Sequence, residues 1–143
     1  MGVIAQLVEP RFSALWKQEF GIDDRDSTLG SLILEAVNAV GKAYAPFASR
    51  AGASDILVTK VLFGTLGCLP ACDTYFKAGF KRCGFKYSSP NASFVAEVFR
   101  FCQDHLSELR KAQSWIEERY EVQYPIMKIV DMYFWQIGFE ALG

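Results

Sequence analysis

Apolar residues recur at spacings of three and four along almost the entire chain, and this period is typical of amphipathic α-helices. The first such run covers residues 3–20 and contains Pro10, which either divides the helix or marks the start of its second part. After a polar break, Asp26 or Ser27 is placed to cap a second helix, which Ala45-Pro46 ends. The first third of the chain therefore predicts two helical segments.

The middle of the chain predicts two more helices. Ser54 or Asp55 is placed to cap a helix over residues 56–66, whose positions are apolar on nearly every face. We therefore expect this helix at the centre of the fold, buried by its neighbours. The next helix covers about residues 71–83 and ends at Gly84, because a glycine after the last turn readily adopts the left-handed cap conformation.

Two further helices are predicted toward the C-terminus. Ser89 or Asn91 is placed to cap a helix that either continues to Tyr120 or bends near Ser107. The last helix covers residues 125–139, because the residue before a proline disfavours the helical conformation. The sequence contains no internal repeat, linker or hairpin signal that would add a second unit.

Composition agrees with one packed domain and limits the kinds of partner that the chain is expected to bind. The pattern and the length of 143 residues together predict one all-α domain over residues 1–143, an orthogonal bundle of about six helices. Aromatic residues make up 15% of the chain, so some rings are expected on a pocket or a partner surface. The net charge of -1 gives no general attraction to nucleic acid or to an anionic membrane.

The sequence predicts a cytoplasmic protein that does not associate with a membrane. No segment approaches the roughly 18 uninterrupted apolar residues of a membrane span. The first residues lack a basic region and soon reach Glu9 and Pro10, so they do not form a secretory signal.

The four cysteines are expected to be reduced and mostly buried, with neither a disulfide nor a metal. They are Cys68, Cys72, Cys83 and Cys102, and no two of them form the Cys-x-x-Cys pair of a zinc site. His105 is the only histidine, which leaves too few ligands for zinc. The sequence also lacks a P-loop and a dinucleotide-binding fingerprint, so no cofactor is expected.

Two roles are open for Asp73. It follows Pro70 and stands at the start of the predicted helix over residues 71–83, where an aspartate usually caps the helix by accepting hydrogen bonds from backbone N–H groups. The other role is a carboxylate at the mouth of a pocket, where it acts as a base or stabilises a developing cation on a bound ligand.

The segment around Asp73 resembles a known family. Val58-Thr59-Lys60-Val61 and Leu69-Pro70-Ala71-Cys72-Asp73-Thr74 are similar to two helix starts of the helix-hairpin-helix DNA glycosylases of the endonuclease III type, and to degenerate bacterial relatives of that fold. The resemblance covers about residues 54–84. It implies catalytic positions at Asp73 and Lys60.

A basic, aromatic face lies on the same predicted helix. Lys77 and Lys81 are one turn apart, Arg82 is beside them, and Tyr75 and other rings alternate with them. Such a helix binds phosphate groups and stacks bases when its side chains converge, and it is a solvated outer face when they do not. These four residues are therefore candidates for binding nucleic acid or another ligand.

The C-terminal helix is apolar on several faces. If Met132 and Trp135 are exposed, they form a candidate surface for a protein partner or a homodimer. Asp131 lies among apolar residues, and we expect it to have a structural role, paired with Lys60, with Arg82 or with a tryptophan N–H, because buried polar groups need a partner.

Two functions follow as hypotheses. The first is a non-catalytic helical interaction protein that binds a protein partner or itself, because aromatic residues are in surplus and no complete catalytic set is present. The alternative is a diverged DNA-glycosylase-like domain that binds nucleic acid or a nucleotide through Asp73 and the basic helix. If the chain is an enzyme, we expect glycosylase-like activity. Duplex DNA is expected to bind weakly, because one basic patch on an acidic protein neutralises few phosphates.

Overall fold

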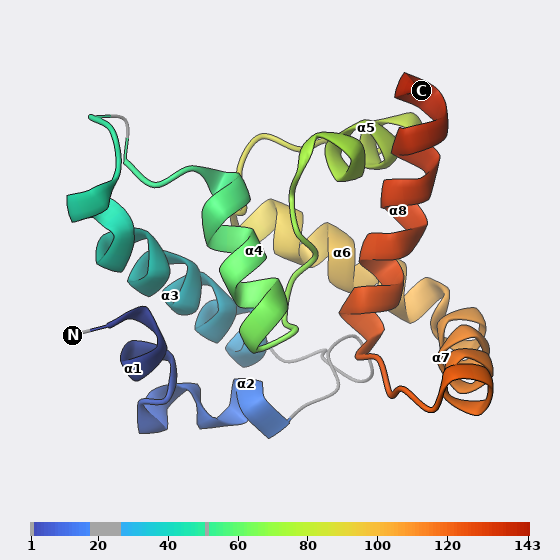
Figure 1. Cartoon of the computed structure of the whole chain (residues 1–143), viewed down its shortest axis with the longest axis horizontal. Coiled ribbons are helices and arrows are strands. Elements are labelled where there is room, and N and C mark those ends of the chain that lie inside the picture. The colour runs from blue at the N-terminus through green and yellow to red at the C-terminus, as the bar shows by residue number, and fades with distance from the viewer. Residues whose placement is uncertain (1, 18–26, 51) are drawn as a thin grey trace.

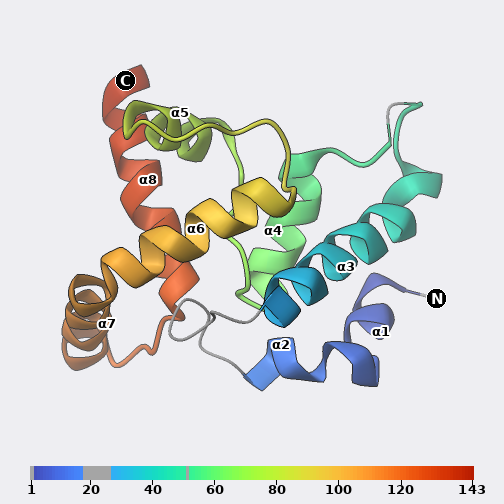
Figure 2. The same ribbon diagram turned by 180° about the vertical axis from the view of Figure 1, so that it is seen from behind.

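A computed structural model describes residues 2–17, 27–50 and 52–143, and these ranges are all-α, as the sequence predicts. They contain eight α-helices, two short 3-10 helices and no strand (Figure 1, Figure 2). In chain order the elements are α1 (Val3–Leu7), η1 (Pro10–Phe12), α2 (Ser13–Lys17), α3 (Ser27–Tyr44), η2 (Ala45–Phe47), α4 (Asp55–Thr65), α5 (Thr74–Arg82), α6 (Ala92–Asp104), α7 (Leu106–Tyr120) and α8 (Ile126–Leu142). No helix in these ranges has both the length and the hydropathy that a membrane span requires.

Side-chain caps fix the starts of three helices. Ser54, Asp73 and Asn91 each accept a hydrogen bond from the backbone N–H three residues later, at 3.2, 2.9 and 3.0 Å. They begin α4, α5 and α6, so the predicted capping role of Asp73 is confirmed. The predicted cap at Asp26 lies outside the described residues.

The helices outnumber the six expected because two predicted helices are divided. Pro10 begins the 3-10 helix η1 between α1 and α2, since its fixed φ and missing N–H interrupt an α-helix. His105 separates α6 from α7 with a non-helical φ of -118°. The fourth predicted helix also starts later than expected, at Thr74, because the residues before it form a buried, non-helical segment.

The core is built largely from phenylalanine rings on α5, α6 and α8. Phe76, Phe80, Phe94, Phe101 and Phe134 are all buried. Their contacting rings have centroids 4.8–6.1 Å apart, mostly edge to face, which is the favourable arrangement for aromatic pairs. This cluster joins the second half of the chain into one packed unit.

α4 stands in the middle of the fold beside α3, but it is less buried than its sequence predicts (Figure 1). Only Val58, Thr59 and Leu62 are buried, and Leu57 is 38% exposed. The expectation of a fully buried central helix is therefore wrong. Part of the apolar surface of α4 faces solvent and an open pocket instead of a neighbouring helix.

α5 and α8 cross at a pair of glycines and lie side by side in both views (Figure 1, Figure 2). A Cβ atom added to Gly79 would overlap the carbonyl oxygen of Phe134 and lie 2.9 Å from the backbone nitrogen of Gly138. A Cβ atom added to Gly138 would overlap the carbonyl oxygen of Tyr75. Only residues without a side chain allow the two backbones to approach this closely.

Candidate functional site

A buried, non-helical segment between α4 and α5 forms the floor of the candidate site. Residues 68–72 are all buried, so their backbone N–H groups cannot rely on water. The N–H of Ala71 donates to Oδ1 of Asp131 on α8, at 2.9 Å. Asp131 therefore accepts its hydrogen bond from the backbone and not from Lys60, Arg82 or a tryptophan N–H, although the charge of Lys60 acts on its carboxyl.

Thr59 on α4 supports the next residue of the same segment. Its hydroxyl donates to the carbonyl oxygen of Asp55 at 2.7 Å and accepts from the N–H of Cys72 at 2.9 Å. Thr59 is fully buried, and these two bonds satisfy its hydroxyl. Two helices thus hold the segment in place through one polar side chain each.

A pocket of about 590 Å³ opens beside this segment and brings the two predicted catalytic residues together. Its walls come from α4, α8 and the residues before α5. The lining residues are Lys60, Phe63, Ala71, Asp73, Asp131, Met132, Trp135 and Gln136. Lys60 and Asp73, the two positions that the family resemblance singles out, both line this pocket. Asp131 is a third charged group that the sequence did not assign to it.

The electrostatics of the pocket centre on Asp131. The pKa of its carboxyl is raised to about 6, chiefly by burial and also by the neighbouring Asp73, while the hydrogen bond from Ala71 and the charges of Lys128 and Lys60 act in the opposite direction. A carboxyl with this pKa can exchange a proton near neutral pH. None of the described residues that line the pocket is a histidine, serine or cysteine. The arrangement therefore offers charge and proton transfer but no side-chain nucleophile of the hydroxyl or thiol kind.

Beside the pocket, α8 carries a second apolar face that no described element covers. Met132, Trp135, Phe139 and Leu142 recur with helical spacing, and Tyr75 of α5 packs against Trp135 and Phe139; we call these five residues the aromatic strip. Four of the five are 36–58% exposed, and Trp135 is half-buried. The condition set for a partner surface is therefore met at Met132, which is exposed, and only in part at Trp135.

The rings of the strip hold one another in place. The rings of Trp135 and Phe139 stack with an interplanar angle of 8° and centroids 5.1 Å apart. The ring of Tyr75 meets both edge-on, at 5.1 and 5.6 Å. Mutual packing of this kind presents a preformed surface, since the side chains need little further ordering to bind a partner.

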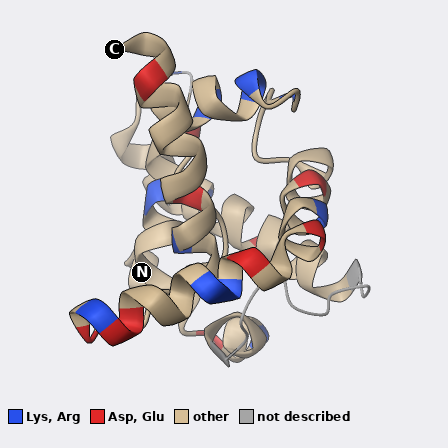
Figure 3. Cartoon of the chain, turned by 90° about the vertical axis from the view of Figure 1, so that its right-hand side faces the viewer, with Lys and Arg blue, Asp and Glu red and all other residues tan. Residues whose placement is uncertain are grey.

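Charges are spread over the molecule and leave this face largely apolar. Figure 3 shows Lys, Arg, Asp and Glu of both signs scattered among several helices, with most of the α8 ribbon carrying neither sign. Gln136 and Glu140 border the strip, joined by a hydrogen bond of 2.8 Å from Nε2 to Oε1. The strip is therefore an apolar surface with a polar edge, the usual anatomy of a protein interface.

The structure separates the predicted basic, aromatic face into three places. Lys77 and Lys81 line a second pocket, away from the one that holds Asp73. Arg82 is exposed and lines neither pocket. Tyr75 belongs to the aromatic strip. Asp73 and the lysines of α5 therefore do not form one binding site.

Three of the four cysteines occupy the core, and none of the four lines either pocket. All four are free, and Cys68, Cys72 and Cys102 are buried as expected, whereas Cys83 is exposed. Burial raises the pKa of each of the three buried thiols to about 12, which makes them poor nucleophiles. Among the described residues, no group of three or more His, Cys, Asp or Glu side chains is arranged to hold a metal ion.

Comparison of the chain with protein-family models, with curated proteins and with solved structures found no match. The resemblance of residues 54–84 to the helix-hairpin-helix glycosylases therefore stays a prediction.

Proposed function

We propose that this chain is a protein-interaction module that binds an amphipathic helix of a partner protein on the aromatic strip. The observation that carries the proposal is the second apolar face of α8, left exposed beside a ring of Tyr75. Aromatic residues are enriched among the side chains that dominate binding energy at interfaces. A surface helix usually has one apolar face, which packs against the core. A second apolar face that is exposed indicates a surface that a partner covers.

The size of the strip favours a single helix over a second copy of the chain. Its five side chains present on the order of 400 Å² of apolar surface. A standard interface buries about 800 Å² on each partner, roughly twice this area. A helix that places side chains at i, i+3 or i+4 and i+7 on the strip matches the smaller area.

The neighbouring pocket sets the chemistry of the partner. Met132 and Trp135 belong both to the strip and to the pocket wall, so the two surfaces are continuous. The pocket contains two carboxylates, Asp73 and Asp131, against one lysine. A Lys or Arg side chain of the partner, one turn away from its apolar anchors, complements this charge and increases the rate and specificity of binding.

A displayed library of amphipathic helical peptides, selected on the purified chain, tests the proposal. We expect the selected peptides to carry apolar residues at helical spacing and at least one Lys or Arg. Phe139→Ser should weaken their binding at least tenfold in a fluorescence anisotropy titration. Phe47→Ser is the matched control, because Phe47 lies on η2 and is 85% exposed, and it should leave binding unchanged.

Two results would contradict the proposal. One is that no peptide is enriched on the wild-type chain relative to the Phe139→Ser variant. The other is a wild-type dimer in sedimentation velocity that Phe139→Ser dissociates and Phe47→Ser does not, since the strip would then bind a second copy of the chain.

A further inference from the structure

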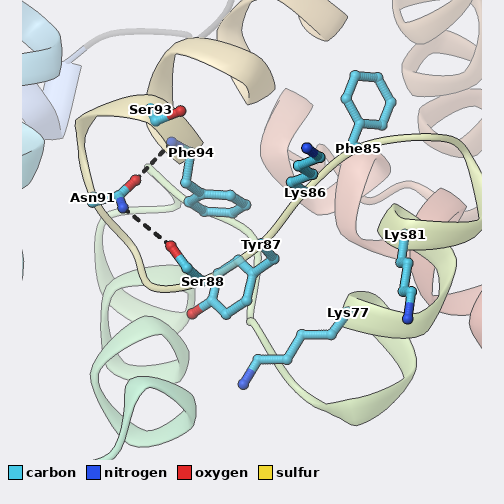
Figure 4. A pocket seen from close by; sticks show the side chains of 9 residues that line it. All are labelled: Lys77, Lys81, Phe85, Lys86, Tyr87, Ser88, Asn91, Ser93 and Phe94. Atoms are coloured by element: carbon cyan, nitrogen blue, oxygen red, sulfur yellow. Dashed lines mark hydrogen bonds between the residues drawn. The ribbon is translucent and has the colours of Figure 1, made fainter.

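The pocket that Lys77 and Lys81 line is a built cavity between two helices and the segment that joins them. It has a volume of about 570 Å³, which lies in the range of small-ligand sites. Figure 4 shows Lys77 and Lys81 extending from α5, Asn91, Ser93 and Phe94 at the start of α6, and Tyr87 between the two helices. Lys86 and Ser88 come from the connecting segment.

The charged residues that line this cavity are all positive. Lys77, Lys81 and Lys86 contribute three positive charges, and no lining residue in the described part of the chain is acidic. None of the three forms an ion pair with a described carboxylate. Lys77 and Lys81 lie one turn apart on α5, where like charges repel each other. An anion between them would relieve this repulsion.

Neighbouring groups hold the cavity in this shape. Nζ of Lys77 lies 4.9 Å from the centroid of the Tyr87 ring, and the hydroxyl of Tyr87 donates to Oδ2 of Asp55 at 3.1 Å. Asp55 is therefore occupied by Tyr87 outside the lining of the cavity. Nδ2 of Asn91 donates to Oγ of Ser88 at 3.3 Å, which fixes the loop against the start of α6 (Figure 4).

We infer that this cavity binds a small organic phosphate of about the size of a mononucleotide. The lysine side chains supply charge for the phosphate, and the hydroxyls of Ser88 and Ser93 supply neutral hydrogen-bond donors in the same wall. Phe85 and Tyr87 give the cavity an apolar side against which the organic part of the ligand packs. This site is independent of the aromatic strip, because the two share no lining residue.

Calorimetric titrations with adenosine 5′-monophosphate, adenosine and inorganic phosphate test the inference. We expect the monophosphate to bind at least tenfold more tightly than either of the other two probes, with an affinity that falls as salt rises. The double variant Lys81→Gln/Lys86→Gln should lose at least tenfold in affinity for the monophosphate. Both lysines are exposed, so the variant is expected to fold, as circular dichroism would verify. Lys111→Gln, an exposed position on α7, is the matched control and should bind like the wild type.

Three outcomes would overturn the inference. The first is no binding of the monophosphate at millimolar concentration, and the second is equal binding by the lysine variant. The third is that a single-stranded oligonucleotide without terminal phosphates binds more tightly than the monophosphate and depends on Lys81 and Lys86, because the cavity would then be part of a nucleic-acid groove.

Discussion

Replacing Gly79 by alanine tests whether the glycine crossing determines how α5 and α8 pack. The added Cβ atom would overlap the carbonyl oxygen of Phe134 and lie 2.8 Å from the carbonyl carbon of the same residue. Carbon atoms in ordinary contact are about 3.5–4.0 Å apart. The helices must therefore separate by roughly 1 Å, and backbone atoms cannot swing aside as a flexible side chain would.

Two opposing effects decide the change in stability. Alanine in the interior of a helix is favoured over glycine by about 0.5–1 kcal/mol. Overpacking of a tight contact costs about 1–3 kcal/mol, and a clash between two backbones belongs at the upper end of this range. We expect Gly79→Ala to lower the free energy of unfolding by about 2–2.5 kcal/mol, a fall in Tm of roughly 4 °C per kcal/mol.

Urea denaturation followed by circular dichroism measures this loss, and Gly64→Ala is the matched control. Gly64 lies inside α4 with no atom within 4 Å of its added Cβ, so alanine should stabilise the protein by about 0.5–1 kcal/mol. The same substitution should thus lower the free energy of unfolding at Gly79 and raise it at Gly64. A Gly79→Ala variant at least as stable as the wild type would refute the steric argument. Gly138→Ala should be similarly harmful, and the double variant should lose less than the sum, because one separation of the helices relieves both clashes.

Four further predictions concern the polar groups and the thiols. Asp73→Asn should leave the stability almost unchanged and Asp73→Ala should lower it by about 0.5–2 kcal/mol in thermal denaturation, because asparagine also caps α5. The pKa of Asp131 is raised to about 6 in the fold, so its contribution to stability is present at about pH 4 and is lost as the pH rises through 6. Asp131→Asn lacks this titration and should therefore gain stability relative to the wild type between about pH 4 and 7. Equal pH dependence of the two unfolding free energies would contradict this. Asp131→Ala should cost about 1–3 kcal/mol, because the N–H of Ala71 is left without a partner. Ellman's reagent should modify only Cys83 in the native protein and all four cysteines in denaturant, whereas rapid native modification of more than one thiol would disprove the burial of the other three.

The local features of the fold could be predicted from the sequence. Ser54, Asp73 and Asn91 are capping residues in front of apolar runs, and all three cap helices as their chemistry predicts. These features depend only on neighbours within a turn or two.

Features that depend on which helices meet could not be predicted. Nothing near Ala71 in sequence indicates that its N–H bonds Asp131, which is sixty residues away along the chain. Glycines inside helices, such as Gly79 and Gly138, are a signal of close packing, but a single sequence does not say which two approach each other. The grouping of Lys77 with Lys86, and not with Asp73, likewise depends on the turn of the chain after α5.

The hydrogen bond between Ala71 and Asp131 has a consequence for biosynthesis. α5 leaves the ribosome well before α8, so for part of translation its buried rings and the preceding segment lack the helix that covers them. The second half of the chain can complete its packing only after α8 emerges, which makes it dependent on contacts of long sequence separation. The nascent chain accordingly exposes these apolar groups until α8 has been synthesised, and chaperones that recognise apolar segments can bind it during that interval.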